Sequence, residues 1–339
     1  MKPYTALTVR GQARRLRLLA GAALRHYDLD VRRLSLVTNQ LNGIFRVDVA
    51  DGEKYILRVT LPEGGHTRDH LSAETDWLAA IDRDTNLRVP RPIPARDGSF
   101  VVEAAAPGVP EPRLCVLFTW APGTNLAGHL SPANTTKLGA LMAGLHAHAL
   151  TYRPKASLAL LHFDRVFPFP EPVLLFEERF STLMPPERRR VFEIAIDWVQ
   201  SAIDRLMASG EPMRILHCDL HQENVRCYRG TLIPIDFEDL MLGWPVQDIA
   251  ITMYNLYPED NYQSLREAFQ EGYTRHCPWP ERYPGEIDAF IAAENLGLAN
   301  FILTDPNPDW RRQAPEFIER VEKRLRILMD INGKFAVYS

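Results

Sequence analysis

Cysteine is scarce in this sequence, and neither sign of charge is in excess. The 339 residues include four cysteines, which are too few and too scattered for the disulfide framework of a secreted protein. The chain carries 39 basic and 43 acidic side chains, so its net charge is −4. No overall field would draw it onto nucleic acid or an anionic membrane. We therefore expect a small-molecule partner and neither of those two, while the oligomeric state stays open.

Long hydrophobic runs are also missing. No apolar stretch approaches the ~20 residues that a membrane span requires. Near the start, four arginines precede an apolar run at 18–24, which Arg25 closes at once. This run is too short for a signal peptide. We interpret the arginines as the solvated face of a first helix and expect a cytoplasmic protein.

The composition is otherwise that of a globular protein, with 46% hydrophobic and 24% charged residues. Residues 31–59 contain three strand-like runs, and apolar and polar side chains alternate along the second run, 44–49. The runs are separated by Asn42-Gly43 and Asp51-Gly52. Such pairs are typical of hairpin turns. The pattern predicts a three-strand antiparallel meander.

After the meander, an apolar stripe predicts a helix over 69–83, with Glu74 at the side of the stripe. Strands are expected to resume around Ile93, at 100–102 and at 114–119. The segment 120–124 has turn chemistry, and we place a boundary between two lobes there. The second lobe begins with a helical pattern from residue 131. Further helices are expected over 191–207, 248–256, 262–276, 286–303 and 315–330.

The richest polar segment is the loop His217-Cys218-Asp219-Leu220-His221-Gln222-Glu223-Asn224. A short hairpin should follow it and gather Asp219, Asn224 and Asp236 into one oxygen-rich cluster. Carboxylate and amide oxygens are ligands that suit Mg²⁺. A carboxylate left off the metal could accept the proton of a hydroxyl group.

The spacing His217-x-Asp219-x-x-x-x-Asn224, followed by Asp236-Phe237, resembles the catalytic and metal-binding loops of the protein-kinase-like fold. The loop is similar to that of the aminoglycoside phosphotransferase and choline kinase superfamily of small-molecule kinases. The order of the other parts agrees over roughly residues 31–330. The resemblance implies an α+β, two-lobe fold: a small antiparallel-sheet lobe that binds nucleotide (1–119) and a larger, mainly helical lobe for catalysis and acceptor binding (120–339).

The same resemblance implies an ATP- and Mg²⁺-dependent phosphotransferase. Asp219 would be the catalytic residue that orients and deprotonates the acceptor hydroxyl. Asn224 and Asp236 would hold Mg²⁺ against the β- and γ-phosphates. His217 and Asp248 would support the catalytic loop.

Nucleotide binding would use the first lobe. Backbone groups of Phe118, Thr119 and Trp120 would meet the adenine edge. Arg58 stands where the family usually has a phosphate-binding lysine, and Glu74 lies on the helix that follows. Arginine can bind two phosphate oxygens, but its planar fork does not replace a compact ammonium group.

Two further departures from the family concern glycine. The loop 38–43 has a single glycine, so its backbone amides reach phosphate at fewer points. Cys218 occupies a position where the family commonly has glycine, and the sequence offers no chemical reason for it.

Simpler interpretations exist for several of these residues. Arg58 could be a solvated strand residue and Glu74 a surface charge. His217 and His221, with cysteines nearby, could form a zinc site, although the spacing is unlike that of structural zinc. His146 and His148 are interpreted as packing or hydrogen-bonding groups.

Three functions remain open at this point. The first is a small-molecule kinase whose acceptor is an amino alcohol, an amino acid, an aminoglycoside or a sugar-like compound. The second is a bacterial Ser/Thr protein kinase of the stress-response type, and the third is a catalytically inactive nucleotide-binding scaffold. Only eleven residues separate Asp236 from Asp248, too few for the long activation segment of protein kinases. This favours a small acceptor.

Overall fold

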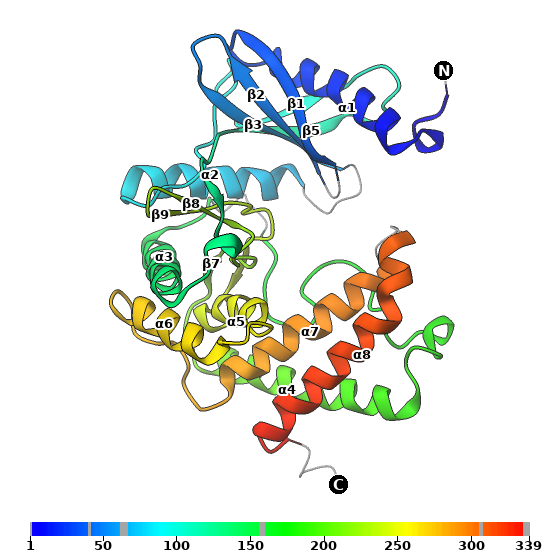
Figure 1. Cartoon of the computed structure of the whole chain (residues 1–339), viewed down its shortest axis with the longest axis vertical. Helices are drawn as coiled ribbons and strands as arrows, with labels where there is room; N and C mark the ends of the chain where they lie inside the picture. Colours follow the sequence, from blue (N-terminus) through cyan, green and yellow to red (C-terminus); the bar gives the residue numbers. More distant parts are fainter. Residues whose placement is uncertain (1, 40–41, 62–66, 156–159, 305–307, 335–339) are drawn as a thin grey trace. The chain divides into compact units, whose positions relative to one another are not determined.

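The computed structural model describes residues 2–39, 42–61, 67–155, 160–304 and 308–334 (Figure 1). By their contacts the residues divide into two compact units. Unit 1 comprises Met1–Asn125, Thr151–Leu160 and Val225–Glu238, and unit 2 comprises Leu126–Leu150, Leu161–Asn224 and Asp239–Ser339. The division of nucleotide and acceptor binding between residues 1–119 and 120–339 stays a prediction.

Unit 1 is built on a five-stranded antiparallel sheet with the order β1-β2-β3-β5-β4. Its strands are β1 (Val31–Asn39), β2 (Gly43–Val49), β3 (Lys54–Val59), β4 (Val101–Ala104) and β5 (Arg113–Thr119). The predicted meander is confirmed. The strand expected around Ile93 is wrong, because within the described residues this segment forms only a bridge between Pro92 and Phe118. The prolines of this segment cannot donate hydrogen bonds to a ladder.

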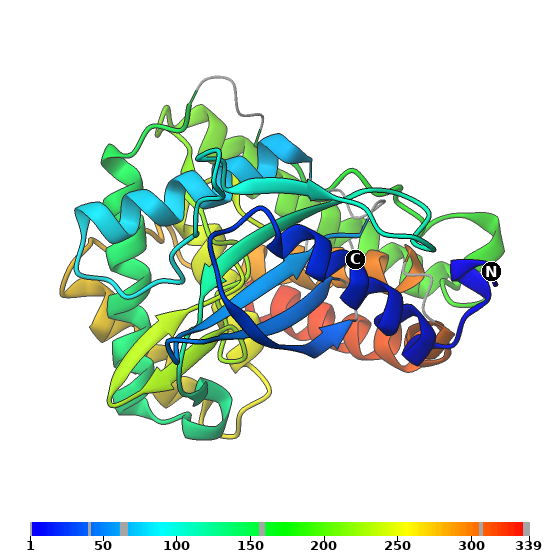
Figure 2. The same ribbon diagram turned by 90° about the horizontal axis from the view of Figure 1, so that it is seen from above.

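Helix α1 (Val9–Leu24) covers this sheet, and Figure 2 shows it lying across the strands. Leu16 and Leu19 are buried in one apolar cluster with Phe45 and Leu57 of the sheet. Arg10, Arg14 and Arg17 are exposed. The interpretation of the arginine-rich start as the solvated face of a helix is therefore confirmed. A 3-10 turn, η1 (Tyr4–Ala6), precedes α1.

Helix α2 (Arg68–Asp84) has nearly the bounds that its apolar stripe predicts. It starts where it does because the Thr67 hydroxyl accepts the His70 N–H at 3.2 Å, which caps the first turn. Trp77 and Leu78 are fully buried, and Glu74 is buried with them. The helix therefore carries an acidic side chain into the interior of unit 1.

A small antiparallel sheet completes unit 1, with the order β6 (Thr124–Asn125), β8 (Val225–Tyr228) and β9 (Thr231–Pro234). Arg229 and Gly230 join β8 to β9 with φ values of 50° and 81°, as a two-residue hairpin turn requires. Val225 pairs with Pro234. The predicted hairpin is confirmed. The chain enters β8 and leaves β9 at the same end of this hairpin.

Unit 2 is mainly helical. Its elements are η2 (Leu126–His129), α3 (Pro132–Thr151), η3 (Glu178–Phe180), α4 (Pro186–Ala208), β7 (Arg214–Leu216), β10 (Met241–Gly243), α5 (Pro245–Leu256), α6 (Tyr262–Thr274), α7 (Glu286–Thr304) and α8 (Pro308–Ile331). Every helix predicted in this region is present. The predicted start of the last one at 315 is wrong, because Pro315 lies inside α8. The helix accommodates this proline, which cannot donate the usual backbone hydrogen bond.

Helix α7 corrects the expectation that no apolar stretch is long enough for a membrane. By length and composition it could span one, with a mean hydropathy of 1.3 over its apolar window. However, 67% of that window is buried, and α7 packs against α4, α5 and α8 (Figure 1). Burial of this kind is typical of the core helix of a globular protein. The fold class, a small antiparallel-sheet lobe and a larger helical lobe, is as predicted.

Candidate functional site

The predicted catalytic loop of unit 2 begins where β7 ends. Strand β7 pairs with β10 in antiparallel register, so that Leu216 lies opposite Met241. Asp248, in the first turn of α5, is completely buried and accepts two backbone hydrogen bonds from the loop. The Cys218 N–H reaches Oδ1 at 2.9 Å, and the His217 N–H reaches Oδ2 at 3.3 Å. Asp248 thus fixes the backbone of the loop just before Asp219.

His146 of α3 supports this buried carboxylate. Its Nε2 lies 3.0 Å from Oδ2 of Asp248, and its Nδ1 lies 2.9 Å from the Tyr273 hydroxyl. Burial alone would raise the pKa of Asp248. The hydrogen bond and charge of His146, with help from His217 and the Cys218 N–H, outweigh burial and lower it. Asp248 is therefore charged at neutral pH, and His146 is a hydrogen-bonding group, as the sequence indicated.

Asp219 is held on several sides within unit 2. Its backbone N–H donates to Nδ1 of His217 at 3.2 Å, so the His217 ring supports the loop directly. The Asn224 Nδ2 donates to Oδ2 of Asp219 at 2.5 Å and to its carbonyl at 3.1 Å. The other carboxylate oxygen lies 3.4 Å from His221 Nε2. The Asp219 side chain is 32% exposed, so it is both oriented and accessible.

The backbone conformation of Cys218 explains why its position favours glycine. Its φ is 61°, in the left-handed region that glycine adopts without strain. This conformation turns the Cys218 N–H toward Asp248. The side chain packs in a small apolar cluster with Phe163, Leu216 and Met241. The position therefore calls for glycine by its backbone, while a small apolar side chain fits the space.

The sequence analysis considered His221 only as a possible zinc ligand and gave Glu294 no role, but the structure brings both residues to Asp219. Burial by itself would lower the pKa of His221, but its hydrogen bond to Asp219 and the nearby negative charges raise it. Burial raises the pKa of Glu294, on α7, to about 8, and the charge of Asp219 adds to this effect. Glu294 lies 75 residues after Asp219 in sequence, and no local pattern relates the two.

The phosphate-binding part predicted for unit 1 centres on Arg58. The Arg58 and Glu74 side chains form a two-point ion pair: Nη1 donates to Oε1 at 3.1 Å, and Nη2 donates to Oε2. The two residues are 4% and 2% exposed, so the readings as a solvated strand residue and a surface charge are wrong. Burial would lower the pKa of Arg58, but Glu74 and Glu238 outweigh it and raise the pKa. The guanidinium stays charged.

Glu238 is a second partner of Arg58 that the sequence analysis did not assign. Its Oε2 lies 3.4 Å from Arg58 Nη1 and accepts the Asn42 Nδ2 at 2.5 Å. Its backbone carbonyl lies 2.5 Å from Nε2 of His70. Its place two residues after Asp236 is the one signal in the sequence that could have drawn attention to it.

Asp236 follows β9 with a φ of 65°, which is uncommon for a residue other than glycine and is tolerated by aspartate. The next residue, Phe237, packs edge-on against Trp77 of α2 with ring centroids 5.6 Å apart. Asn224 belongs to unit 2 and Asp236 to unit 1, so their joint role as metal ligands stays a prediction. Across the described residues, no group of three or more His, Cys, Asp or Glu side chains is arranged to hold a metal.

The predicted adenine segment ends β5. The Thr119 N–H donates to the Arg91 carbonyl at 2.9 Å, and the Trp120 N–H donates to the Lys54 carbonyl at 3.1 Å. Both amides are therefore used within unit 1, and an adenine contact here would rest on other backbone groups. The adenine assignment stays a prediction.

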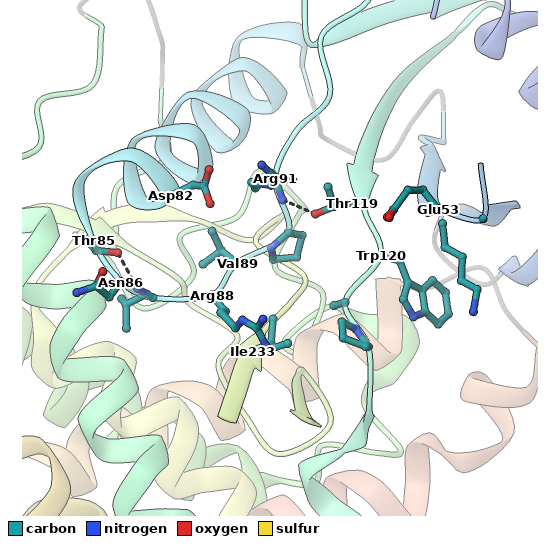
Figure 3. A pocket seen from close by; sticks show the side chains of 16 residues that line it. Glu53, Asp82, Thr85, Asn86, Arg88, Val89, Arg91, Thr119, Trp120 and Ile233 are labelled. Carbon is teal, nitrogen blue, oxygen red and sulfur yellow. Dashed lines mark hydrogen bonds between the residues drawn. The ribbon is translucent and has the colours of Figure 1, made fainter. Parts of the chain in front are cut away.

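A cavity of about 580 Å³ lies beside this segment within unit 1 (Figure 3). Thr119 and Trp120 line it, and the Arg91 N–H donates to the Thr119 hydroxyl on its wall. Arg58 and Glu74 are not among its lining residues. The rest of the lining is formed by Gly52, Glu53, Lys54, Asp82, Thr85, Asn86, Leu87, Arg88, Val89, Pro90, Ala121, Pro122 and Ile233.

Comparison with known proteins agrees with this geometry. Residues 35–290 match the model of the phosphotransferase enzyme family. Amicoumacin kinase of Bacillus subtilis is 27% identical over 268 residues, which cover 76% of this chain and 74% of that kinase.

Solved structures show the same fold. A microcompartment-associated aminopropanol kinase has a TM-score of 0.75 at 20% identity and covers 93% of this chain and 97% of its own. A spectinomycin phosphotransferase, solved with ADP and spectinomycin, has a TM-score of 0.60 at 11% identity and covers 92% and 98%. The chain therefore belongs to the phosphotransferase enzyme family.

Proposed function

We propose that this phosphotransferase transfers the γ-phosphoryl group of ATP to a hydroxyl group of a small molecule, with Mg²⁺ as the metal. The acceptor class is an amino alcohol, amino acid, aminoglycoside or sugar-like compound. The relative at 27% identity is named as an amicoumacin kinase, and a structural neighbour is named as an aminopropanol kinase. These names support a small acceptor.

The arrangement of Asp219 carries the proposal. One carboxylate oxygen is held by Asn224 and the other lies near His221, so the group is oriented while it stays accessible. In the proposed reaction, Asp219 orients the acceptor hydroxyl and takes its proton as the oxygen attacks the γ-phosphorus, and ADP leaves. His217 and Asp248 hold the backbone that presents Asp219.

Asn224 also fits the proposed metal. Both of its hydrogen bonds to Asp219 come from Nδ2, so the amide is turned with Oδ1 away from Asp219. An amide oxygen and the Asp236 carboxylate are ligands of the kind that Mg²⁺ prefers. We propose that these two residues hold it, and a bound Mg²⁺ would neutralise charge on the β- and γ-phosphates.

The segment after Asp236 supports a small acceptor over a protein. Between Glu238 and the start of α5 at Pro245, the chain forms only the short strand β10. Protein kinases use a long activation segment at this point to bind peptides. The catalytically inactive scaffold is disfavoured because Asp219, Asn224 and Asp236 are all present.

A transfer assay tests the proposal. The purified protein is incubated with γ-³²P-ATP, Mg²⁺ and panels of amino alcohols, amino acids, aminoglycosides and sugars, and the products are separated. We expect label on one class of small molecule, and none with Asp219→Asn. Label on protein would support the Ser/Thr kinase instead, and no label on any acceptor would support the scaffold.

A further inference from the structure

Glu238 occupies a place in unit 1 that none of the predicted roles explains. Its side chain is 13% exposed, and one carboxylate oxygen meets two donors, Nδ2 of Asn42 and Nη1 of Arg58. Asn42 comes just before β2, and Arg58 lies within β3. Through the hydrogen bond from Asn42 and the ion pair with Arg58 at 3.4 Å, Glu238 links the start of β2 and strand β3 to the segment that carries Asp236.

Asn42 links Glu238 to a third point. It is 7% exposed, and while its Nδ2 donates to Glu238, its Oδ1 accepts the Leu61 N–H at 3.3 Å. The amide is therefore used on both sides. Together with the contact of His70 to the Glu238 carbonyl, this fixes both the backbone and the side chain of Glu238.

The ion pair with Glu74 fixes the plane of the Arg58 guanidinium but leaves its Nε–H without an acceptor in the part of the chain that the structure describes. That pair uses Nη1 and Nη2 of the guanidinium, and Glu238 approaches Nη1 as well. Among the described residues, nothing accepts the N–H at Nε, although that atom is buried. A buried guanidinium N–H without an acceptor costs free energy, and a phosphate oxygen would satisfy it.

We propose that Glu238 is a positioning residue for nucleotide phosphates: it holds Arg58 so that the Nε–H can donate to a phosphate oxygen. This inference rests on the proposed use of a nucleoside triphosphate. Arginine suits the role because its planar fork can contact two carboxylates and keep a further donor, which a lysine ammonium cannot do with the same geometry. Glu238 thus accounts for arginine at a position where the family usually has lysine.

Glu238→Gln tests the proposal, since it removes the charge and keeps the size. The binding of AMP-PNP with Mg²⁺ and of adenosine is measured by calorimetry on the full chain. Loss of one charge-assisted contact should weaken AMP-PNP binding about tenfold. Adenosine has no phosphate, so its affinity should not change. Glu103→Gln is the matched control, because Glu103 forms an exposed pair with Arg68 in the same unit.

The coupling between Glu238 and Arg58 is tested by a double-mutant cycle with Arg58→Lys. If Glu238 acts through Arg58, Glu238→Gln should weaken AMP-PNP binding less than about threefold in the Arg58→Lys background. A full tenfold loss in that background would overturn the proposal. So would tighter binding of AMP-PNP to Glu238→Gln, which would mean that Glu238 merely repels phosphate.

Asn42→Ala is a second test of the proposal, because it removes a hydrogen bond to Glu238 and leaves every charge in place. The variant should weaken AMP-PNP binding several-fold and leave adenosine binding intact. Thermal unfolding shows whether each variant is folded. Equal losses of affinity for AMP-PNP and for adenosine would indicate a merely structural role and overturn the inference. If the native chain binds AMP-PNP but transfers phosphate to no acceptor, the proposed function fails while this binding test still stands.

Discussion

Asp248 accepts the backbone N–H of Cys218 at 2.9 Å, and this hydrogen bond holds the loop in a left-handed turn directly before Asp219. The acceptor is completely buried and the donor nearly so. A buried carboxylate with three donors around it is stable only as an anion whose partners stay in place. The placement of Asp219 therefore depends on a group that does not itself need to touch substrate.

Asp248→Asn should damage both folding and turnover. The amide would keep one acceptor but turn an NH₂ group toward N–H donors, so the free energy of unfolding should fall by about 2–4 kcal/mol. We expect kcat to fall by about tenfold or more, because the loop loses its anchor. Chemical unfolding and steady-state kinetics measure the two effects. Glu193→Gln, in an exposed pair with Arg189, is the control and should change neither.

Cys218→Gly should be nearly neutral for stability. Relief of the left-handed backbone gains about 1 kcal/mol, and loss of the buried side chain costs about as much. Cys218→Val keeps an apolar side chain but is β-branched, so it should cost about 2 kcal/mol or more at a φ of 61°. Urea unfolding of both variants checks the order. A valine variant as stable as the glycine variant would contradict the backbone argument.

Asp219→Ala and Asp236→Ala should fail in different ways. Without Asp219, transfer should drop about 10²–10⁴-fold because the hydroxyl loses its base, while nucleotide binding stays nearly intact. Without Asp236, the Mg²⁺-dependent part of nucleotide binding should disappear. Calorimetry with AMP-PNP, with and without Mg²⁺, separates the two. Full turnover by Asp219→Ala would refute its role as the base.

Much of the fold followed from local patterns. The meander over 31–59 has turn dipeptides between its three runs and a two-residue period in its middle run, and it forms as predicted. Pro315 misled because proline usually starts a helix, yet α8 continues through it. The segment around Ile93 gave the opposite error, a strand that was predicted but does not form. Its apolar character suggested a strand, and its prolines prevent one.

The site was predictable where residues are near in sequence or match the family pattern. Asp219 and Asn224 are five residues apart and form a hydrogen bond. Glu238 and Asn42 are 196 residues apart, so no periodicity could relate them. Cys218 is a third case, because the sequence did not explain why a cysteine stands at this position. Its φ angle and the hydrogen bond from its N–H to Asp248 explain what the position requires.

Glu294 predicts how stability depends on pH. Its pKa is raised in the folded protein to about 8, whereas the pKa of an exposed glutamate is near 4.5. Between these values the folded state binds more protons than the unfolded state, so the free energy of unfolding falls as pH rises. Glu294 is partly exposed, and we expect a loss on the order of 1–2 kcal/mol across this window.

Glu294→Gln should remove this loss, because glutamine does not titrate. Thermal unfolding of the native chain and the variant at pH 5, 6.5 and 8 measures the slopes, with Glu319→Gln in an exposed pair on α8 as the control. The variant should gain most over the native chain at pH 8 and little at pH 5. Parallel pH profiles would mean that Glu294 is charged at neutral pH, and that burial and Asp219 do not raise its pKa as far as the geometry indicates.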